Sequence, residues 1–153
     1  MWRPEREAIE RDALDGVVLA GMRATLGRAT SNPAWAQRIG ADSHIDRIDD
    51  WHRLPFLTKN DLRDAYPFAL ACGNSYLRVH MSSGTTGNPI LNPYTAHDVA
   101  QWGEVMARCY VAAGVTRADV IQITPSFGLF TGGFGFHYGA EQQIGRASCR
   151  ERV

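Results

Sequence analysis

A run of hydroxyl and glycine residues at positions 82–89 is the part of the sequence best suited to chemistry. It reads Ser-Ser-Gly-Thr-Thr-Gly-Asn-Pro. Gly84 and Gly87 can adopt positive φ and bring the backbone close to a ligand, so that successive N–H groups point at one anion. Four residues add hydroxyl groups that can donate to phosphate oxygens: Ser82, Ser83, Thr85 and Thr86. The run therefore predicts a phosphate-binding loop over residues 82–87.

The spacing of this run excludes a Walker A motif. Only two residues separate Gly84 from Gly87, and Asn88 follows, whereas a Walker A loop has four residues between its first glycine and a Gly-Lys-Ser/Thr sequence. A solvated connection rich in Ser, Thr and Gly would have the same composition. Composition alone therefore leaves both interpretations open.

The residues on either side of the run predict the elements that would position it. Alternation over residues 76–81 indicates a short strand, and a second strand can start at residues 89–91. Apolar spacing predicts a helix over residues 95–113, with Thr95 and Asp98 as a capping box, Gly114 as its end and Cys109 on its buried face. Residues 119–124 indicate another strand. Strand, helix and strand in this order predict a βαβ unit with parallel strands.

The N-terminal part of the sequence predicts helices. Residues 5–28 lack proline and repeat apolar residues at steps of three and four. Residues 33–40 predict a further short helix, and Thr58 with Asp61 forms a capping-box pattern for a helix over residues 59–65. The predicted fold class is therefore α/β, with N-terminal helices followed by the βαβ unit.

Three blocks of the sequence resemble one enzyme family. Residues 78–89 resemble the signature loop of adenylate-forming enzymes. Residues 54–68 are similar to the segment that precedes this loop in phenylacetate-CoA ligases, and residues 127–133 with 137–141 are similar to the block that follows it. The resemblance covers about residues 32–141 and departs at Asn88, where many of these ligases carry lysine. It implies that the chain is a partial N-terminal domain of an adenylate-forming enzyme.

The resemblance also implies a reaction. Such ligases use ATP with Mg²⁺ to convert a carboxylic acid, here an aromatic acid like phenylacetate, into an acyl adenylate, and coenzyme A then displaces AMP. The loop would hold the phosphates, and the acid would lie near a second set of residues: Phe127, Gly128, Phe130, Thr131, Gly132 and Gly133. The family's acidic Mg²⁺ ligand, ribose-binding aspartate and catalytic lysine have no counterpart in this sequence, so no catalytic residue is assigned.

Side chains near the third block have simpler explanations. Phe134 and Phe136 are expected in the core, and His137 and Glu141, at i and i+4, are expected to pair on a helix face.

Two further functions stay open at this point. One is another adenylate-forming ligase of the same group, which would act on a different aryl acid or ligate AMP to a deazaflavin cofactor. The other is a non-catalytic nucleotide-binding domain that is complete at this length. The pocket walls that would separate the two ligases lie outside the three blocks.

The last residues differ in character from the rest. Residues 144–153 show neither apolar periodicity nor turn residues, and a common short-read sequencing adapter can encode them in full. We therefore expect residues 143–153 to be a non-native tail, and residues 1–142 to be an incomplete part of the AMP-binding large domain. Such a fragment is expected to be inactive alone.

Composition limits the partners. Lys plus Arg and Asp plus Glu are equal at 16 each, which argues against a nucleic-acid-binding protein. The sequence has no apolar run long enough for a membrane span, and its three cysteines and five histidines lack metal-ligand spacing, so no protein-held metal is expected. A cytoplasmic enzyme of small molecules follows, and a homodimer of the full-length enzyme is allowed.

Overall fold

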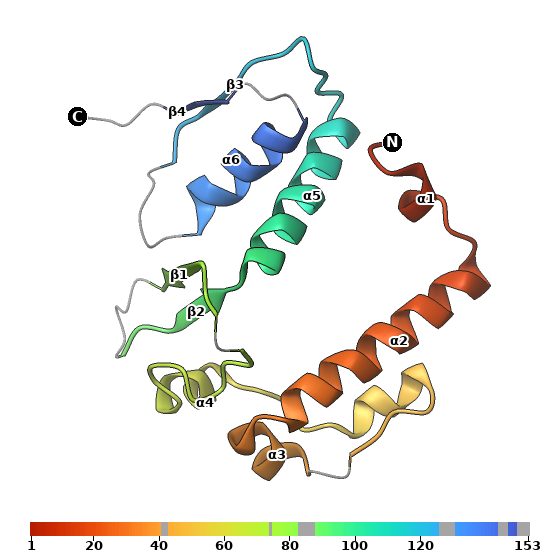
Figure 1. Cartoon of the computed structure of the whole chain (residues 1–153), viewed down its shortest axis with the longest axis vertical. Helices are drawn as coiled ribbons and strands as arrows, with labels where there is room; N and C mark the ends of the chain where they lie inside the picture. The colour runs from red at the N-terminus through yellow and green to blue at the C-terminus, as the bar shows by residue number, and fades with distance from the viewer. Residues whose placement is uncertain (41–42, 74, 83–87, 126–130, 144–146, 150–153) are drawn as a thin grey trace. The chain divides into compact units, whose positions relative to one another are not determined.

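The computed structural model describes residues 1–40, 43–73, 75–82, 88–125, 131–143 and 147–149, and the chain divides into two compact units. Unit 1 is Met1–Glu7 with Ser75–Val153, and unit 2 is Ala8–Asn74. The described residues of unit 2 form four helices: α2 (Arg11–Thr30), α3 (Pro33–Ile39), the 3₁₀ helix η1 (Ile48–Arg53) and α4 (Lys59–Asp64). Unit 1 contains the remaining elements, which Figure 1 labels: α1 (Pro4–Glu7), β1 (Arg78–Met81), β2 (Leu91–Tyr94), α5 (Ala96–Ala112), β3 (Ile121–Ile123), α6 (Gly132–Gln143) and β4 (Ala147–Cys149).

In unit 2, one asparagine fastens the start of α3 to a distant segment. Asn32 caps α3, because its Oδ1 accepts backbone N–H groups of the first helical turn. Its Nδ2 donates to the carbonyl oxygens of Ala69 and Ala71, both at 3.0 Å. The indole Nε1 of Trp35 donates at 2.8 Å to the carbonyl oxygen of Leu70, the residue between Ala69 and Ala71. These bonds fix residues 69–71 against α3, although about 37 residues separate them in the sequence.

Both predicted capping boxes are confirmed. The Asp61 N–H donates to Thr58 Oγ1 at 3.3 Å, and Asp61 Oδ2 accepts the Thr58 N–H at 2.6 Å. Helix α4 begins at Lys59, directly after Thr58. Thr95 and Asp98 repeat this arrangement at 3.2 and 2.8 Å at the start of α5. Gly114, with φ of +87°, follows the end of α5.

The helix predicted over residues 5–28 is two helices. Pro4 starts the single turn α1, and Glu10 is extended, with φ of −63° and ψ of +148°, before α2 begins at Arg11. Pro4 is well placed at a helix start because it has no N–H to satisfy. The apolar period of this segment therefore predicted the helical state but not the break at residues 8–10.

In unit 1, α5 and α6 lie side by side (Figure 1). Glycines on α6 make this contact close. A Cβ at Gly139 would lie 3.0 and 3.1 Å from backbone atoms of Met106 and Ala107 on α5, and a Cβ at Gly135 would lie 2.6 Å from the indole of Trp102. Real Cβ atoms essentially never come within 3.0 Å of such a neighbour, and the Cβ at Gly139 would be closer than that to the Met106 Cβ, so the helices reach this separation only with glycine there. Ala107 is fully buried in the contact.

The α/β fold class is confirmed, but the parallel strands lie one helix later than the sequence predicted. Among the described residues, β2 pairs with β1 in antiparallel register, His80 opposite Asn92, rather than with β3. The nine residues between Met81 and Leu91 can close a hairpin but are too few for a parallel crossover. The parallel pair is β3 with β4, and α6 connects them.

Strand β4 falls in the tail that the sequence sets apart. A strand edge presents N–H and C=O groups that a neighbouring extended segment can pair with, whatever its origin. The three-residue pairing with β3 therefore does not test the expectation that residues 143–153 are a non-native tail.

Two expected core positions are exposed. Cys109 is exposed, because the buried positions of α5 are Gly103 and Ala107, and two residues beyond Ala107 is a rotation of about 200° around the helix. Phe136 is 44% exposed, since α6 faces α5 through Gly135 and Gly139 instead. In the described part of the chain, no helix combines the length and apolar composition that a bilayer crossing requires.

Candidate functional site

The two ends of the predicted phosphate loop meet at Ser82 and Ile90. The Ser82 N–H donates to the Ile90 oxygen at 3.0 Å, and the Ile90 N–H donates to Ser82 Oγ at 2.9 Å. Ile90 is 8% exposed and Ser82 is half-buried. The hairpin ladder continues on the strand side, where the Leu77 N–H donates to the Tyr94 oxygen at 2.8 Å. We call the Ser82–Ile90 pair of hydrogen bonds the loop neck.

The remaining predicted loop residues lie outside the described part of the chain: Ser83, Gly84, Thr85, Thr86 and Gly87. The same holds for Phe127, Gly128 and Phe130 of the predicted acid site. The described members of that site are three consecutive residues at the start of α6. Thr131 and Gly132 are half-buried and Gly133 is buried. The site predictions for these residues thus stay predictions.

An aromatic cluster lies directly behind the loop neck. His80, two residues before Ser82, is 1% exposed, and its ring lies 5.3 Å from Tyr94, 5.6 Å from Trp102 and 5.6 Å from Phe134, each edge to face. Tyr94 also stacks on Trp102 at 5.5 Å. The cluster joins β1, β2, α5 and α6, so it sets the position of the hairpin on the helix pair. Phe134, expected in the core, is half-buried and packs against His80 in this cluster.

Polar atoms in this cluster are short of partners. The Tyr138 ring also belongs to the cluster, at 6.0 Å from those of Trp102 and Phe134. Neither ring nitrogen of His80 has a hydrogen-bond partner within the described residues, and the same is true of Tyr138 Oη. Burial raises the pKa of the Tyr138 hydroxyl above its usual range, and the nearby Arg78 opposes the rise. The cluster was missed from the sequence, although His80 on a strand and Trp102 on the apolar stripe of α5 were signals for it.

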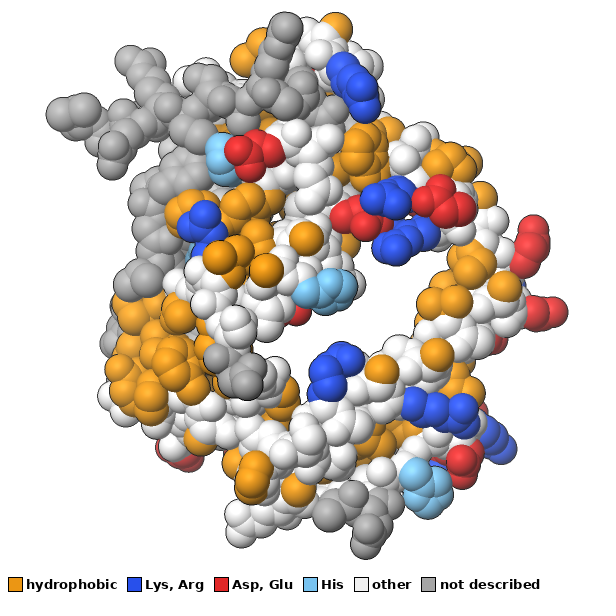
Figure 2. Space-filling model, viewed as in Figure 1, with side chains coloured by type: hydrophobic (Ala, Val, Ile, Leu, Met, Phe, Trp, Pro, Cys, Tyr) orange, Lys and Arg blue, Asp and Glu red, His pale blue; other side chains and the backbone are white. Residues whose placement is uncertain are grey.

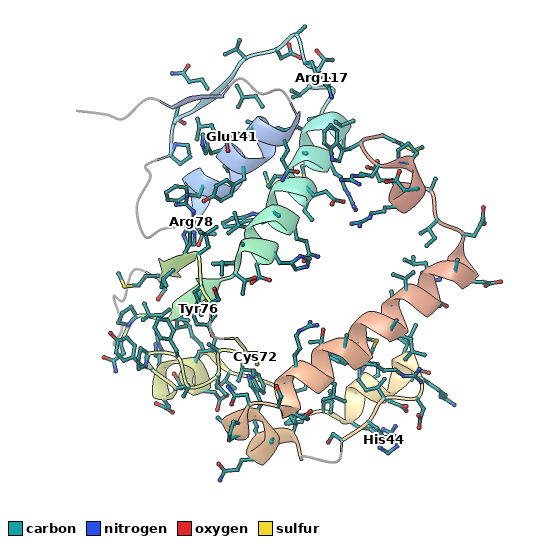
Figure 3. All side chains as sticks on the ribbon, viewed as in Figure 1. His44, Cys72, Tyr76, Arg78, Arg117 and Glu141 are labelled. Carbon is teal, nitrogen blue, oxygen red and sulfur yellow. The ribbon has the colours of Figure 1, made fainter. Side chains whose placement is uncertain are left out.

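One guanidinium lies against the aromatic cluster. Arg78 Cζ lies 4.7 Å from the centre of the Phe134 ring and 5.3 Å from that of Tyr138, within range of a cation–π contact. Figure 3 shows Arg78 beside α6, with Glu141 further along the same helix. His137 Nε2 and Glu141 Oε1 are 3.3 Å apart, so the predicted helix-face pair is confirmed.

A second charged group in unit 1 has a structural explanation. Arg6 lies 3.1 Å from Glu104, and Arg108 also pairs with Glu104 one turn along α5. These contacts, the hydrogen bond from Arg108 above all, lower the pKa of Glu104. Figure 2 shows basic and acidic side chains next to one another on this face. The charges compensate one another and fix α1 on α5, so we assign them no ligand.

Unit 2 has an apolar cavity of about 550 Å³ between α2, α3 and η1. Leu26, Trp35, Trp51 and Leu57 line it, and Phe56 at its rim is 91% exposed. The indole Nε1 of Trp35 is already hydrogen-bonded to a backbone carbonyl. Four further polar residues line the cavity, Thr25, Arg28, His52 and Cys72, and Arg28 Nη2 donates to Thr25 Oγ1 at 3.0 Å, so most of the wall is apolar.

The described residues include no group of three His, Cys, Asp or Glu side chains that could hold a metal ion. What the described site offers is a hairpin with a closed neck, held on two helices by packed rings. Such an arrangement can hold the two ends of a loop in place.

Comparison with known proteins agrees with the sequence blocks. No protein-family model matches the chain. Phenylacetate-coenzyme A ligases from Aromatoleum evansii, Pseudomonas putida and Escherichia coli K12 are 46%, 40% and 38% identical to it over 143 residues, which cover 89% of this chain. The chain spans about a third of the length of these relatives. The resemblance to phenylacetate-CoA ligases is thus confirmed for this portion of their length.

Solved structures confirm the fold. A 2-hydroxyisobutyryl-CoA ligase in the postadenylation state, in complex with 2-HIB-AMP, superposes with a TM-score of 0.82 at 22% identity over 97% of this chain and 33% of that one. The same ligase in the thioesterification state with 2-HIB-AMP and CoA gives a TM-score of 0.83 at 24% identity. The chain therefore has the fold of a partial domain of an adenylate-forming ligase.

Proposed function

We propose that this chain is part of an AMP-forming acid–thiol ligase that activates an aromatic carboxylic acid of the phenylacetate type. The observation that carries the proposal is the match of most of the chain to phenylacetate-coenzyme A ligases at 35–46% identity. The loop neck supports it, because a hairpin that holds the ends of a Ser/Gly/Thr loop together is the geometry that a phosphate-binding loop needs.

The proposed reaction has two half-reactions. A carboxylate oxygen attacks the α-phosphorus of ATP, and the bond to pyrophosphate breaks, which leaves an acyl adenylate. The thiol sulfur of coenzyme A then attacks the acyl carbon and loses its proton. The bond between the acyl carbon and the AMP oxygen breaks, and AMP leaves with the electron pair of that bond. Positioning and charge neutralisation dominate such transfers.

In this scheme the residues of the chain bind rather than react. Residues 82–87 would hold the phosphates that leave, and residues 127–133 would line the acid site. Mg²⁺ would accompany the ATP and neutralise phosphate charge. Since no described cluster of acidic or imidazole side chains could hold the ion, we assign it no ligand in this chain. The enzyme would act in the cytoplasm on small molecules.

The test is a chimera with the Aromatoleum evansii relative, in which residues 1–142 of this chain replace the matching third of that ligase. We expect AMP and pyrophosphate to form only with an arylacetate or related acid, ATP and CoA together. The parent ligase is the positive control, and the 153-residue chain alone is expected to be inactive. A folded chimera that makes ADP and phosphate, or that shows no acid-dependent turnover across an aromatic panel, would contradict the proposal. A panel that includes a deazaflavin cofactor would identify the related ligase activity instead.

A further inference from the structure

Ser82 makes a contact within its own hairpin that the sequence did not predict. The sequence groups it with Ser83, Thr85 and Thr86 as a donor to phosphate. In the structure its Oγ accepts the Ile90 N–H at 2.9 Å, a bond that leaves the hydroxyl proton able to donate. Its backbone N–H is engaged as well, by the Ile90 oxygen at 3.0 Å. The residue thus bonds the far end of its own loop twice.

The site of this contact makes the hydroxyl difficult to replace. Ile90 is 8% exposed, so water has little access to its N–H. A buried N–H without an acceptor costs more than the hydrogen bond itself contributes, because the group has lost its water and gained nothing. An alanine at position 82 would leave the Ile90 N–H in this state.

The neck is also rigidly placed. Ser82 directly follows β1, whose register with β2 pairs Met81 with Leu91, the residue after Ile90. Two residues before Ser82, His80 is packed among the rings of three elements. A loop that starts and ends at this neck therefore leaves the hairpin from fixed points.

We infer that Ser82 is a positioning residue, which holds the ends of the phosphate loop at a fixed separation through the bond that its Oγ accepts from the Ile90 N–H. The expected effect of Ser82 on catalysis rests on the proposed function. The hydrogen bond between Ser82 and Ile90 does not, because it lies within this chain. The two parts can therefore be tested separately.

The first test uses the 153-residue chain and measures amide hydrogen exchange at Ile90 by NMR. We expect Ser82→Ala to speed exchange at Ile90 about tenfold. Ser82→Thr, which keeps a hydroxyl on the same carbon, should restore the slow exchange. Ser31→Ala is the matched control: it removes a hydroxyl that bonds a backbone carbonyl at the end of α2, in the other unit, and Ile90 should not respond. Unchanged exchange at Ile90 in Ser82→Ala would overturn the inference whatever the enzyme does.

The second test uses the chimera and follows acid-dependent exchange of pyrophosphate into ATP. For Ser82→Ala we expect kcat per folded enzyme to fall about tenfold and the KM for the acid to stay unchanged, with recovery in Ser82→Thr. A role confined to stability would lower the melting temperature but leave kcat per folded enzyme as it was, and would overturn the inference. If the chimera has no activity even with Ser82 in place, the proposed function fails, whereas exchange at Ile90 still decides whether Ser82 holds the neck.

Discussion

Adding one methyl group to the α5–α6 contact should reverse the usual effect of a glycine-to-alanine change in a helix. Alanine normally stabilises a helix by up to about 1 kcal/mol relative to glycine. At Gly139 the new Cβ would meet the side chain of Met106 and, at 3.0 and 3.1 Å, backbone atoms of Met106 and Ala107. Backbone on the facing helix moves aside less readily than a flexible side chain, so the helices must separate.

The magnitude follows from two opposing terms. Overpacking of a core costs about 1–3 kcal/mol, and the gain in helix propensity offsets about 1 kcal/mol of that. Because the clash is with backbone, we expect Gly139→Ala to lower the free energy of unfolding by about 1–2 kcal/mol. For a chain of this size the melting temperature should fall by roughly 2–8 °C.

The assay is urea denaturation of the 153-residue chain, with Gly16→Ala as the matched control. Gly16 lies in the middle of α2, and a Cβ there would meet no atom within 4 Å. This control should gain about 0.5–1 kcal/mol, so the two variants should shift the midpoint in opposite directions. If Gly139→Ala were as stable as the unchanged chain or more so, the close approach of α5 and α6 would not depend on glycine and the packing argument would be refuted.

Three more outcomes are expected. In the chimera, changing both Thr85 and Thr86 to Ala should lower kcat/KM for ATP at least tenfold, because hydrogen bonds from the hydroxyls to charged phosphate oxygens are lost. The free energy of unfolding should stay within about 0.5 kcal/mol, and a large loss of stability with normal adenylate formation would mean that these residues support the fold instead. Hydrogen bonds from Thr58 lower the pKa of Asp61 from its ordinary 3.8 to about 2, so this carboxylate stabilises the fold above pH 3.8 and the contribution is lost as the pH falls towards 2. Acid unfolding of Asp61→Asn should lack that component, and an unchanged acid profile would contradict the linkage. Tyr138→Phe removes a buried hydroxyl without a described partner, so denaturation should show no loss of stability and a gain of up to about 1 kcal/mol, whereas a clear loss would reveal a partner for the hydroxyl.

Local signals in the sequence predicted local structure well. Thr95 with Asp98, and Thr58 with Asp61, specify helix starts through bonds between residues three apart, so they can be read without knowledge of the fold. The same is true of Gly114 at the end of α5. The fold class and the family resemblance followed from such short segments taken in order.

Features that depend on distant residues were harder to predict. The partner of β2 is set by the hairpin closure rather than by the strand's own residues, so the parallel pair was expected one helix too early. Cys109 has the spacing of a core residue, but the face of α5 that is buried depends on where the α6 glycines allow contact. Ser82 looked equivalent to its neighbours until its bond to Ile90 was visible.

The bonds of Asn32 have a consequence for where the chain of unit 2 can be cut. Its side-chain Nδ2 donates to the carbonyl oxygens of Ala69 and Ala71 at 3.0 Å. The chain between Asn32 and Ala69 therefore forms a loop that hydrogen bonds, rather than a covalent link, close. Phe56, in the middle of that loop, is 91% exposed. A protease that cleaves after aromatic residues is therefore expected to cut there first. Cleavage there would leave two pieces that are still fastened at Asn32. The Phe56 carbonyl oxygen also accepts a hydrogen bond from Arg38 Nη2 at 2.6 Å, so the cut end of the first piece would be held at this second point as well.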